Sequence, residues 1–125
     1  MRHVLAPEMI HPAIQPKVSD LNRALVEEVM AAVASEGIVV VGMGQNPHCA
    51  KIRKALDAAG VQYRYMEYGN YLNNWRRRTA FKMWTGWPTL PMVFAGGFLV
   101  GGASDAIALL STGELQRLAA SRSLG

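Results

Sequence analysis

Four consecutive β-branched residues at positions 38–41, Ile-Val-Val-Val, constrain the fold more than any other stretch of this chain. β-branched side chains favour extended backbone, and an apolar run without alternation is typical of a strand that is buried on both faces. Such a strand lies at the centre of a sheet that is covered on both sides. The rest of the chain must therefore supply neighbouring strands and two layers of covering elements.

Helical segments are expected before and after this central strand. Ser19 offers a hydroxyl N-cap, apolar residues follow at helical spacing, and Gly37 closes the helix. Pro47 suits the first turn of a second helix, which Gly60 ends. Further helices are predicted over residues 75–84, with Asn73 or Asn74 as the cap, and after the Gly101-Gly102 pair.

Three further strands are predicted, at residues 61–66, 92–95 and 98–100. A helix between the first two strands of the chain implies a parallel pair, whereas Gly96-Gly97 between the last two implies an antiparallel hairpin. The predicted fold class is therefore α/β, with a mixed four-stranded sheet flanked by helices on both faces.

The length of 125 residues is enough for one domain with its own core. Residues 1–18 lack periodicity and contain three prolines, so they are expected to form an extended N-terminal arm before a domain at residues 19–125. The arm is too polar and too broken by proline for a secretory signal, and no window is long and apolar enough for a membrane helix. We therefore expect a cytoplasmic protein without a membrane partner.

The net charge of +4 comes largely from one run, Arg76, Arg77 and Arg78, with Lys82 one turn later. No extended basic face and no DNA- or RNA-binding motif accompanies this run. It therefore predicts a solvated helix face or a site for one small anion, and no nucleic-acid partner.

Cys49 is the one cysteine of the chain, which excludes an internal disulfide and a zinc site built mainly from thiolates. The three histidines, His3, His11 and His48, lack metal-ligand spacing and would meet only if the arm folded back over the Cys49 turn. No metal site is therefore expected from these residues alone.

Three sequence blocks together resemble the glutaredoxin family of the thioredoxin-like superfamily, over residues 38–118. The first, Asn46-Pro47-His48-Cys49, is similar to the family's Cys-Pro-Tyr-Cys turn. The second, Trp87-Pro88-Thr89-Leu90-Pro91, is similar to the Trp-Pro-Thr-x-Pro stretch of monothiol glutaredoxins. The third, residues 99–105 followed by Thr112-Gly113-Glu114-Leu115, is similar to the family's Gly-Gly-Cys-Asp-Asp block and the Ser-Gly-Glu-Leu after it.

This resemblance implies a thioredoxin-like fold and a groove that binds glutathione. The Leu90 backbone would pair with the tripeptide's cysteine beside a cis Pro91, and Arg78 would bind the glycine carboxylate through two parallel bonds. The γ-glutamyl carboxylate would lie at a helix N-terminus formed by Gly101, Gly102, Ala103 and Ser104. The other residues expected at the groove are Asn46, His48, Thr89 and Asp105.

The chain departs from the family pattern at three positions. Asn46 stands where the family has its nucleophilic cysteine, and Met43 stands where it has a lysine. Ser104 replaces the aspartate after the Gly-Gly pair, with Asp105 next to it as a partial substitute. The predicted glutathione site thus keeps its backbone and loses several charges.

An alternative alignment places Cys49 itself at the nucleophile position. That alignment shortens the following helix by about one turn and misplaces Pro47 and Gly60, so the one with Asn46 first is preferred. In it, Cys49 lies in the first turns of a helix, where the dipole would lower its pKa. A free cysteine is more often a small buried apolar residue than a reactive thiol, and both interpretations of Cys49 remain open.

The sequence leaves more than one function open. The first is a glutathione-linked thiol–disulfide oxidoreductase, a redox protein with Cys49 as its single catalytic thiol. The alternative is a non-catalytic module that holds glutathione, a two-iron two-sulfur cluster ligated by Cys49, or a protein partner. A domain that uses only its arm or the surface of residues 76–78 for protein contact is a third. The expected partners are glutathione and a protein disulfide or iron–sulfur protein, and the chain is expected to be a monomer or a weak homodimer.

Overall fold

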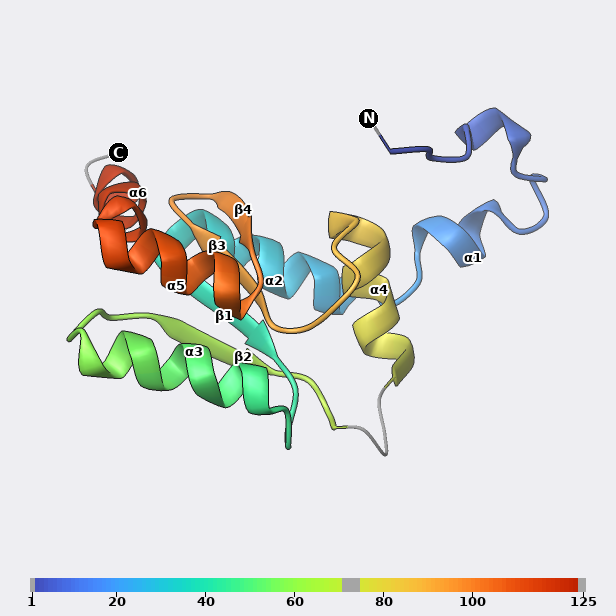
Figure 1. Cartoon of the computed structure of the whole chain (residues 1–125). Coiled ribbons are helices and arrows are strands. Elements are labelled where there is room, and N and C mark those ends of the chain that lie inside the picture. The colour runs from blue at the N-terminus through green and yellow to red at the C-terminus, as the bar shows by residue number, and fades with distance from the viewer. Residues whose placement is uncertain (1, 71–74, 124–125) are drawn as a thin grey trace.

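The computed structural model describes residues 2–70 and 75–123 of the chain. The elements that carry the domain are, in chain order, α2 (Arg23–Ser35), β1 (Ile38–Gly42), α3 (Pro47–Ala58), β2 (Arg64–Glu67), α4 (Trp75–Thr85), β3 (Met92–Ala95), β4 (Phe98–Gly101), α5 (Ala103–Thr112) and α6 (Glu114–Ser123). A short 3-10 helix, η1 (Pro7–Met9), and a short helix, α1 (Gln15–Ser19), precede them. Figure 1 shows these elements in one domain, with the N-terminal segment projecting from it.

The four strands form one mixed sheet in the order β2-β1-β3-β4. β1 pairs in parallel with β2, with Val40 opposite Tyr65, and antiparallel with β3, where Val40 lies opposite Val93. β3 and β4 form the antiparallel hairpin, and Gly96 and Gly97 both have positive φ in its turn. The predicted fold class, the central position of residues 38–41 and the directions of the two predicted pairings, β1 with β2 and β3 with β4, are confirmed.

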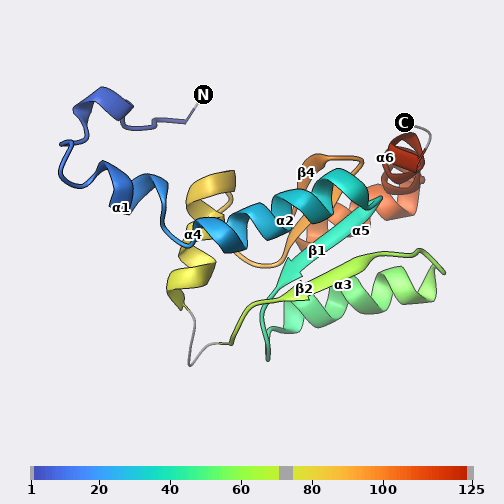
Figure 2. The same ribbon diagram turned by 180° about the vertical axis from the view of Figure 1, so that it is seen from behind.

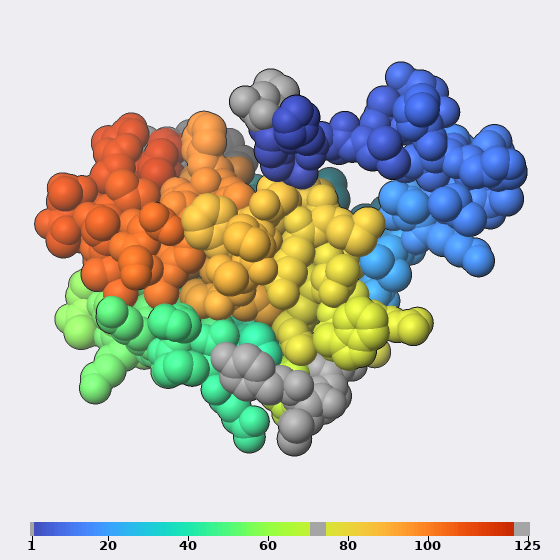
Figure 3. Space-filling model, turned by 45° about the vertical axis from the view of Figure 1, so that its right-hand side comes forward, coloured from blue at the N-terminus to red at the C-terminus, as the bar shows by residue number. Residues whose placement is uncertain are grey.

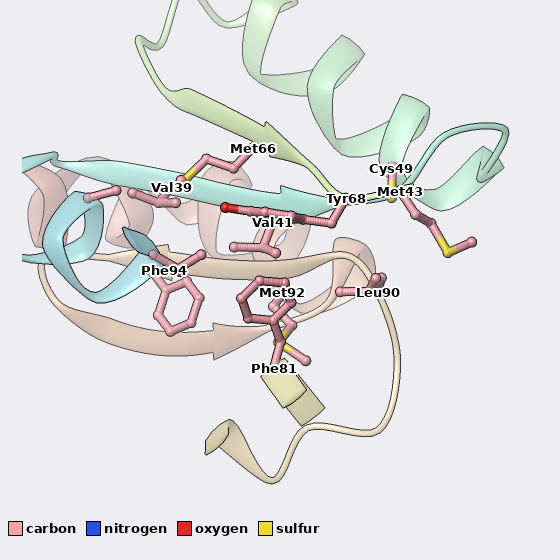
Figure 4. Close-up of a cluster of buried hydrophobic side chains, with 12 residues drawn as sticks. Val39, Val41, Met43, Cys49, Met66, Tyr68, Phe81, Leu90, Met92 and Phe94 are labelled. Carbon is pink, nitrogen blue, oxygen red and sulfur yellow. The ribbon is translucent and has the colours of Figure 1, made fainter. Parts of the chain in front are cut away.

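Each face of the sheet has its own hydrophobic core. On one face, Val39, Val41, Met92 and Phe94 pack against α2 and α4, with Phe81 of α4 fully buried among them (Figure 4). On the other face, Ile38, Val40, Val93 and Ala95 pack against α3, α5 and α6. Figures 1 and 2 show the same two helical layers from front and back. All five residues of β1 are buried because its side chains alternate between these two cores.

The helix predicted from Ser19 begins later. Ser19 is the last residue of α1, and α2 starts at Arg23 after Asn22, whose φ of 47° is left-handed. Asparagine tolerates this conformation better than most residues, so the chain turns at Asn22 and two helices replace the expected one. The strand predicted at 61–66 is also shifted, since β2 spans Arg64–Glu67. The predicted caps Asn73 and Asn74 lie outside the described residues.

The sequence predicts an extended N-terminal arm, but two parts of the arm are helical. Pro7 and Pro16 lie in the first turns of η1 and α1, where a missing amide hydrogen costs no helical hydrogen bond. Neither short helix contains a buried residue, so the arm contributes nothing to the two cores. Among the described residues, no helix has the length and apolarity required to cross a membrane.

Phe81 and Phe98 make a matched pair for testing the core, because the first is fully buried and the second is 64% exposed. Phe81→Ala should lower the free energy of unfolding by about 3–5 kcal/mol, since it removes a ring from a closed core. Phe98→Ala should lower it by less than about 1 kcal/mol. Denaturant unfolding of both variants measures the difference, and equal losses would show that the packing around Phe81 is wrong.

Candidate functional site

The turn between β1 and α3 is fixed by the side chain of Asn46. Its Oδ1 accepts hydrogen bonds from the backbone N–H groups of His48 (2.8 Å) and Cys49 (3.2 Å), which caps the N-terminus of α3. Its Nδ2 donates to the backbone carbonyl of Leu90 at 3.3 Å. Asn46 is itself buried, so both ends of its carboxamide are held between the helix start and the segment before β3.

A groove of about 450 Å³ lies beside this turn, between the ends of three segments that are distant in sequence. Asn46 and His48 come from the start of α3, Thr89, Leu90 and Pro91 from the segment before β3, and Gly102 to Asp105 from the start of α5. The structure thus brings together these predicted residues: Asn46, His48, Thr89, Leu90, Pro91, Gly102, Ala103, Ser104 and Asp105. The peptide bond between Leu90 and Pro91 is cis, as the family resemblance implied.

The start of α5 forms one wall of the groove. α5 has ten residues, and the backbone amides of its first turn, from Ala103 and Ser104, are at the positive end of the helix dipole. Asp105 turns back to this terminus, where its Oδ2 accepts the Gly102 N–H at 3.0 Å. The carboxylate predicted to substitute for the missing aspartate at Ser104 is therefore used as a helix cap.

Gly101 does not line the groove, although it was predicted there. Its φ of 116° lies in the region that favours glycine, and a Cβ on it would come within 2.5 Å of Asp105 Oδ2. The glycine is needed so that the chain can leave β4 and bring the Asp105 carboxylate against the start of α5. Gly101 therefore contributes to the groove through the backbone path that it allows, and not as a lining residue.

Arg78 also lies away from the groove. Its side chain is buried, and Nη1 donates to the backbone carbonyl of Tyr68 at 3.3 Å. Lys82, one helical turn later on the same side of α4, is the basic residue that lines the groove. The two residues lie within about 40° of each other around the helix axis, so the sequence alone could not show which of them reaches the groove.

Cys49 does not line the groove, although Asn46 and His48 of the same turn do. The residue is only 2% exposed, packs beside Met43 at the end of β1 (Figure 4), and borders a different hollow with Tyr65 and Glu67. Burial raises the pKa of the Cys49 thiol and outweighs the Met43 backbone hydrogen bond, which acts in the opposite direction. The expectation of a lowered pKa is therefore wrong, and the environment is that of an inert thiol.

Tyr65 packs next to Cys49, and both border the same hollow. Its hydroxyl donates to Glu67 Oε1 at 3.0 Å, and the guanidinium carbon of Arg53 lies 4.0 Å from the ring centroid. A Cβ on Gly42 would come within 2.7 Å of the Tyr65 hydroxyl oxygen and 3.0 Å of Cys49 Sγ. Because position 42 has no side chain, the tyrosine can close over the sulfur.

A metal site does not form in the described part of the chain. Among residues 2–70 and 75–123, no three His, Cys, Asp or Glu side chains lie close enough together to hold an ion. The arm does not bring His3 and His11 together with His48.

The sequence and the fold both match glutaredoxins. Residues 38–100 match the glutaredoxin family model. The chain is 42% identical over 98 residues to a glutaredoxin-like protein of Dictyostelium discoideum, across 78% of this chain and 80% of that protein. It is 35% identical over 83 residues to a glutaredoxin of Ricinus communis, covering 66% and 81% of the two chains.

Solved structures give the same result. Oxidized glutaredoxin 2 from Chlamydomonas reinhardtii superposes with a TM-score of 0.67 and 30% identity, over 81% of this chain and 95% of that one. A buckwheat glutaredoxin–glutathione complex superposes with a TM-score of 0.67 and 24% identity, over 84% and 94%. With its mixed sheet, cis Pro91 and proline-containing turn at the start of α3, this chain belongs to the glutaredoxin family.

Proposed function

We propose that this protein binds glutathione in the groove beside Asn46 and does not carry out thiol–disulfide exchange. The observation that carries the proposal is the side chain of Asn46, which occupies the start of α3 with every polar atom engaged in hydrogen bonds to the protein. A carboxamide cannot form a mixed disulfide. The single thiol of the chain, Cys49, is buried away from the groove with a raised pKa.

The groove retains features that suit a tripeptide with two carboxylates. Lys82 supplies a positive charge, and the first-turn amides of α5, at Ala103 and Ser104, supply hydrogen-bond donors at the positive end of a helix. Leu90 lines the groove beside the cis Pro91; because its carbonyl already accepts from Asn46 Nδ2, strand-like pairing would use its backbone N–H. The fold similarity to a glutaredoxin–glutathione complex supports the same ligand.

The residues present do not fit a two-iron two-sulfur cluster. Such a cluster needs cysteine thiolates at an accessible position, whereas Cys49 is 2% exposed and covered by Tyr65. Asn46 occupies the position from which the family ligates iron. We therefore propose glutathione alone as the small-molecule ligand, and the proposed function requires no iron.

Lys82 should contribute to glutathione affinity through its charge. Because it is partly buried in the groove, Lys82→Ala should weaken binding about 5- to 10-fold, the effect of losing one charge-assisted contact. Lys54→Ala, an exposed lysine of α3 outside the groove, is the matched control and should leave the Kd unchanged. Isothermal titration with reduced glutathione measures both, and equal effects would place the ligand elsewhere.

Asn46→Cys should create the exchange activity that the protein lacks. The variant is made with Cys49→Ser, so that the new thiol is the only one. The new thiolate would replace Asn46 Oδ1 as the acceptor of the backbone N–H groups of residues 48 and 49. These hydrogen bonds should lower the pKa of the new thiol below about 8.5. It would attack the glutathione sulfur of a mixed disulfide, form a disulfide with it, and release the substrate thiolate, which takes up a proton.

Turnover of a glutathionylated peptide, followed with excess glutathione, measures this gain. The wild type and Cys49→Ser should both be inactive, and only the Asn46→Cys variant should turn over. Wild-type turnover that Cys49→Ser abolishes would instead establish Cys49 as the catalytic thiol.

Cys49 itself should react slowly with iodoacetamide. Its raised pKa keeps the thiol protonated at neutral pH, so the alkylation rate should rise only well above pH 8.5, about the pKa of a free thiol. Tyr65→Ala should accelerate alkylation because it removes the covering ring. Mass spectrometry of the alkylated protein against pH gives both rates. Fast alkylation of the wild type at pH 7 would contradict the buried position.

A further inference from the structure

Most of the large apolar side chains that the described residues expose are gathered in two places. The N-terminal arm carries Val4, Leu5, Met9, Ile14 and Val18, and the outer face of α2 and α4 carries Met30, Met83 and Trp84. Val4, Leu5 and Met9 are each exposed by 66% or more. Clusters of this kind are characteristic of protein–protein contact surfaces, unlike scattered single residues.

The α2/α4 face is hollowed into an apolar groove of about 370 Å³. We call it the α2/α4 groove, and its apolar lining consists of Val18 at the root of the arm and of Leu21, Val26, Met30, Ala80, Met83 and Trp84. Two charged residues line it, Arg23 and Glu27, and they compensate each other through an ion pair of 2.9 Å; Asp20, which lies 3.6 Å from Arg23, is outside the lining. The groove therefore suits apolar side chains rather than a run of acidic or basic ones.

The arm does not fill the groove of its own chain. Its root touches the groove through Val18, and its other end lies beside Gly86, where a Cβ would come within 2.6 Å of Arg2 Nε. Between these two points the arm arches away from the domain (Figure 3). The apolar side chains of Leu5 and Met9 thus lie on a segment that stands off from the domain, although an apolar groove begins at its root.

We propose that two copies of this chain form a homodimer in which the arm of each copy packs its apolar side chains into the α2/α4 groove of the other. A two-fold exchange removes both exposed clusters from water at once, and it uses the same arm–groove contact twice. The partner is a second copy because the apolar segment and the apolar groove are both present on each chain. The dimer does not depend on glutathione binding.

Point variants of exposed residues test the proposal without disturbing the core. The double variant Leu5→Glu/Met9→Glu changes the arm, Met83→Glu changes the groove, and Phe98→Glu is a matched control, since Phe98 is 64% exposed outside both surfaces. Light scattering after size exclusion should give the wild type and Phe98→Glu twice the 13.6 kDa chain mass. The arm variant and the groove variant should each give the mass of one chain.

Mixing the two monomeric variants distinguishes a dimer formed by arm exchange from dimers formed through other surfaces. A heterodimer of the arm variant with Met83→Glu keeps one unchanged arm against one unchanged groove, so the mixture should partly recover the dimer mass. A monomeric wild type would overturn the proposal. This includes a monomer whose arm is protected from hydrogen exchange because it fills the groove of its own chain. A dimer that survives both variants, or that Phe98→Glu disrupts equally, would also overturn it.

Discussion

The burial of β1 on both faces is the constraint from which the rest of the domain follows. Its side chains enter two cores in alternation, so helices must cover both sides of the sheet. Its edges pair with β2 in one direction and β3 in the other, so the chain must cross over once through α3 and return once through α4. The strand also ends at Gly42, directly before the turn that carries Asn46, which places the groove at this end of the sheet.

At that end, the side-chain carboxamide of Asn46 holds the turn in place through three hydrogen bonds. An N-cap that satisfies helix amides contributes typically about 1 kcal/mol to stability, and Asn46 adds a bond to the Leu90 carbonyl. Asn46 therefore holds the turn before α3 with its side-chain amide and not with a thiol. The neighbouring sulfur of Cys49 has become part of the packing, because Gly42 lets Tyr65 close over it.

The sequence predicted the sheet and most of the groove, and it did so for a physical reason. The positions of the strands along the chain, the hairpin at Gly96-Gly97 and the proline at the start of α3 depend on local conformational preferences that each residue carries with it. The three blocks of the groove are likewise contiguous in sequence, and most of their residues meet as expected. Asn22 was one exception in the local structure, because the hydrophobic periodicity continues across its left-handed turn.

The amino-acid sequence by itself determined the mixed sheet, the two helical layers and the absence of a thiol at position 46. Tertiary structure alone decided that Lys82 rather than Arg78 lines the groove, since the choice depends on how α4 lies against its neighbours and not on helical phase. It also decided that Cys49 is buried with a raised pKa, because the covering residue Tyr65 comes from another strand. Side-chain exposure is a property of the assembled packing, and no pattern within one segment fixes it.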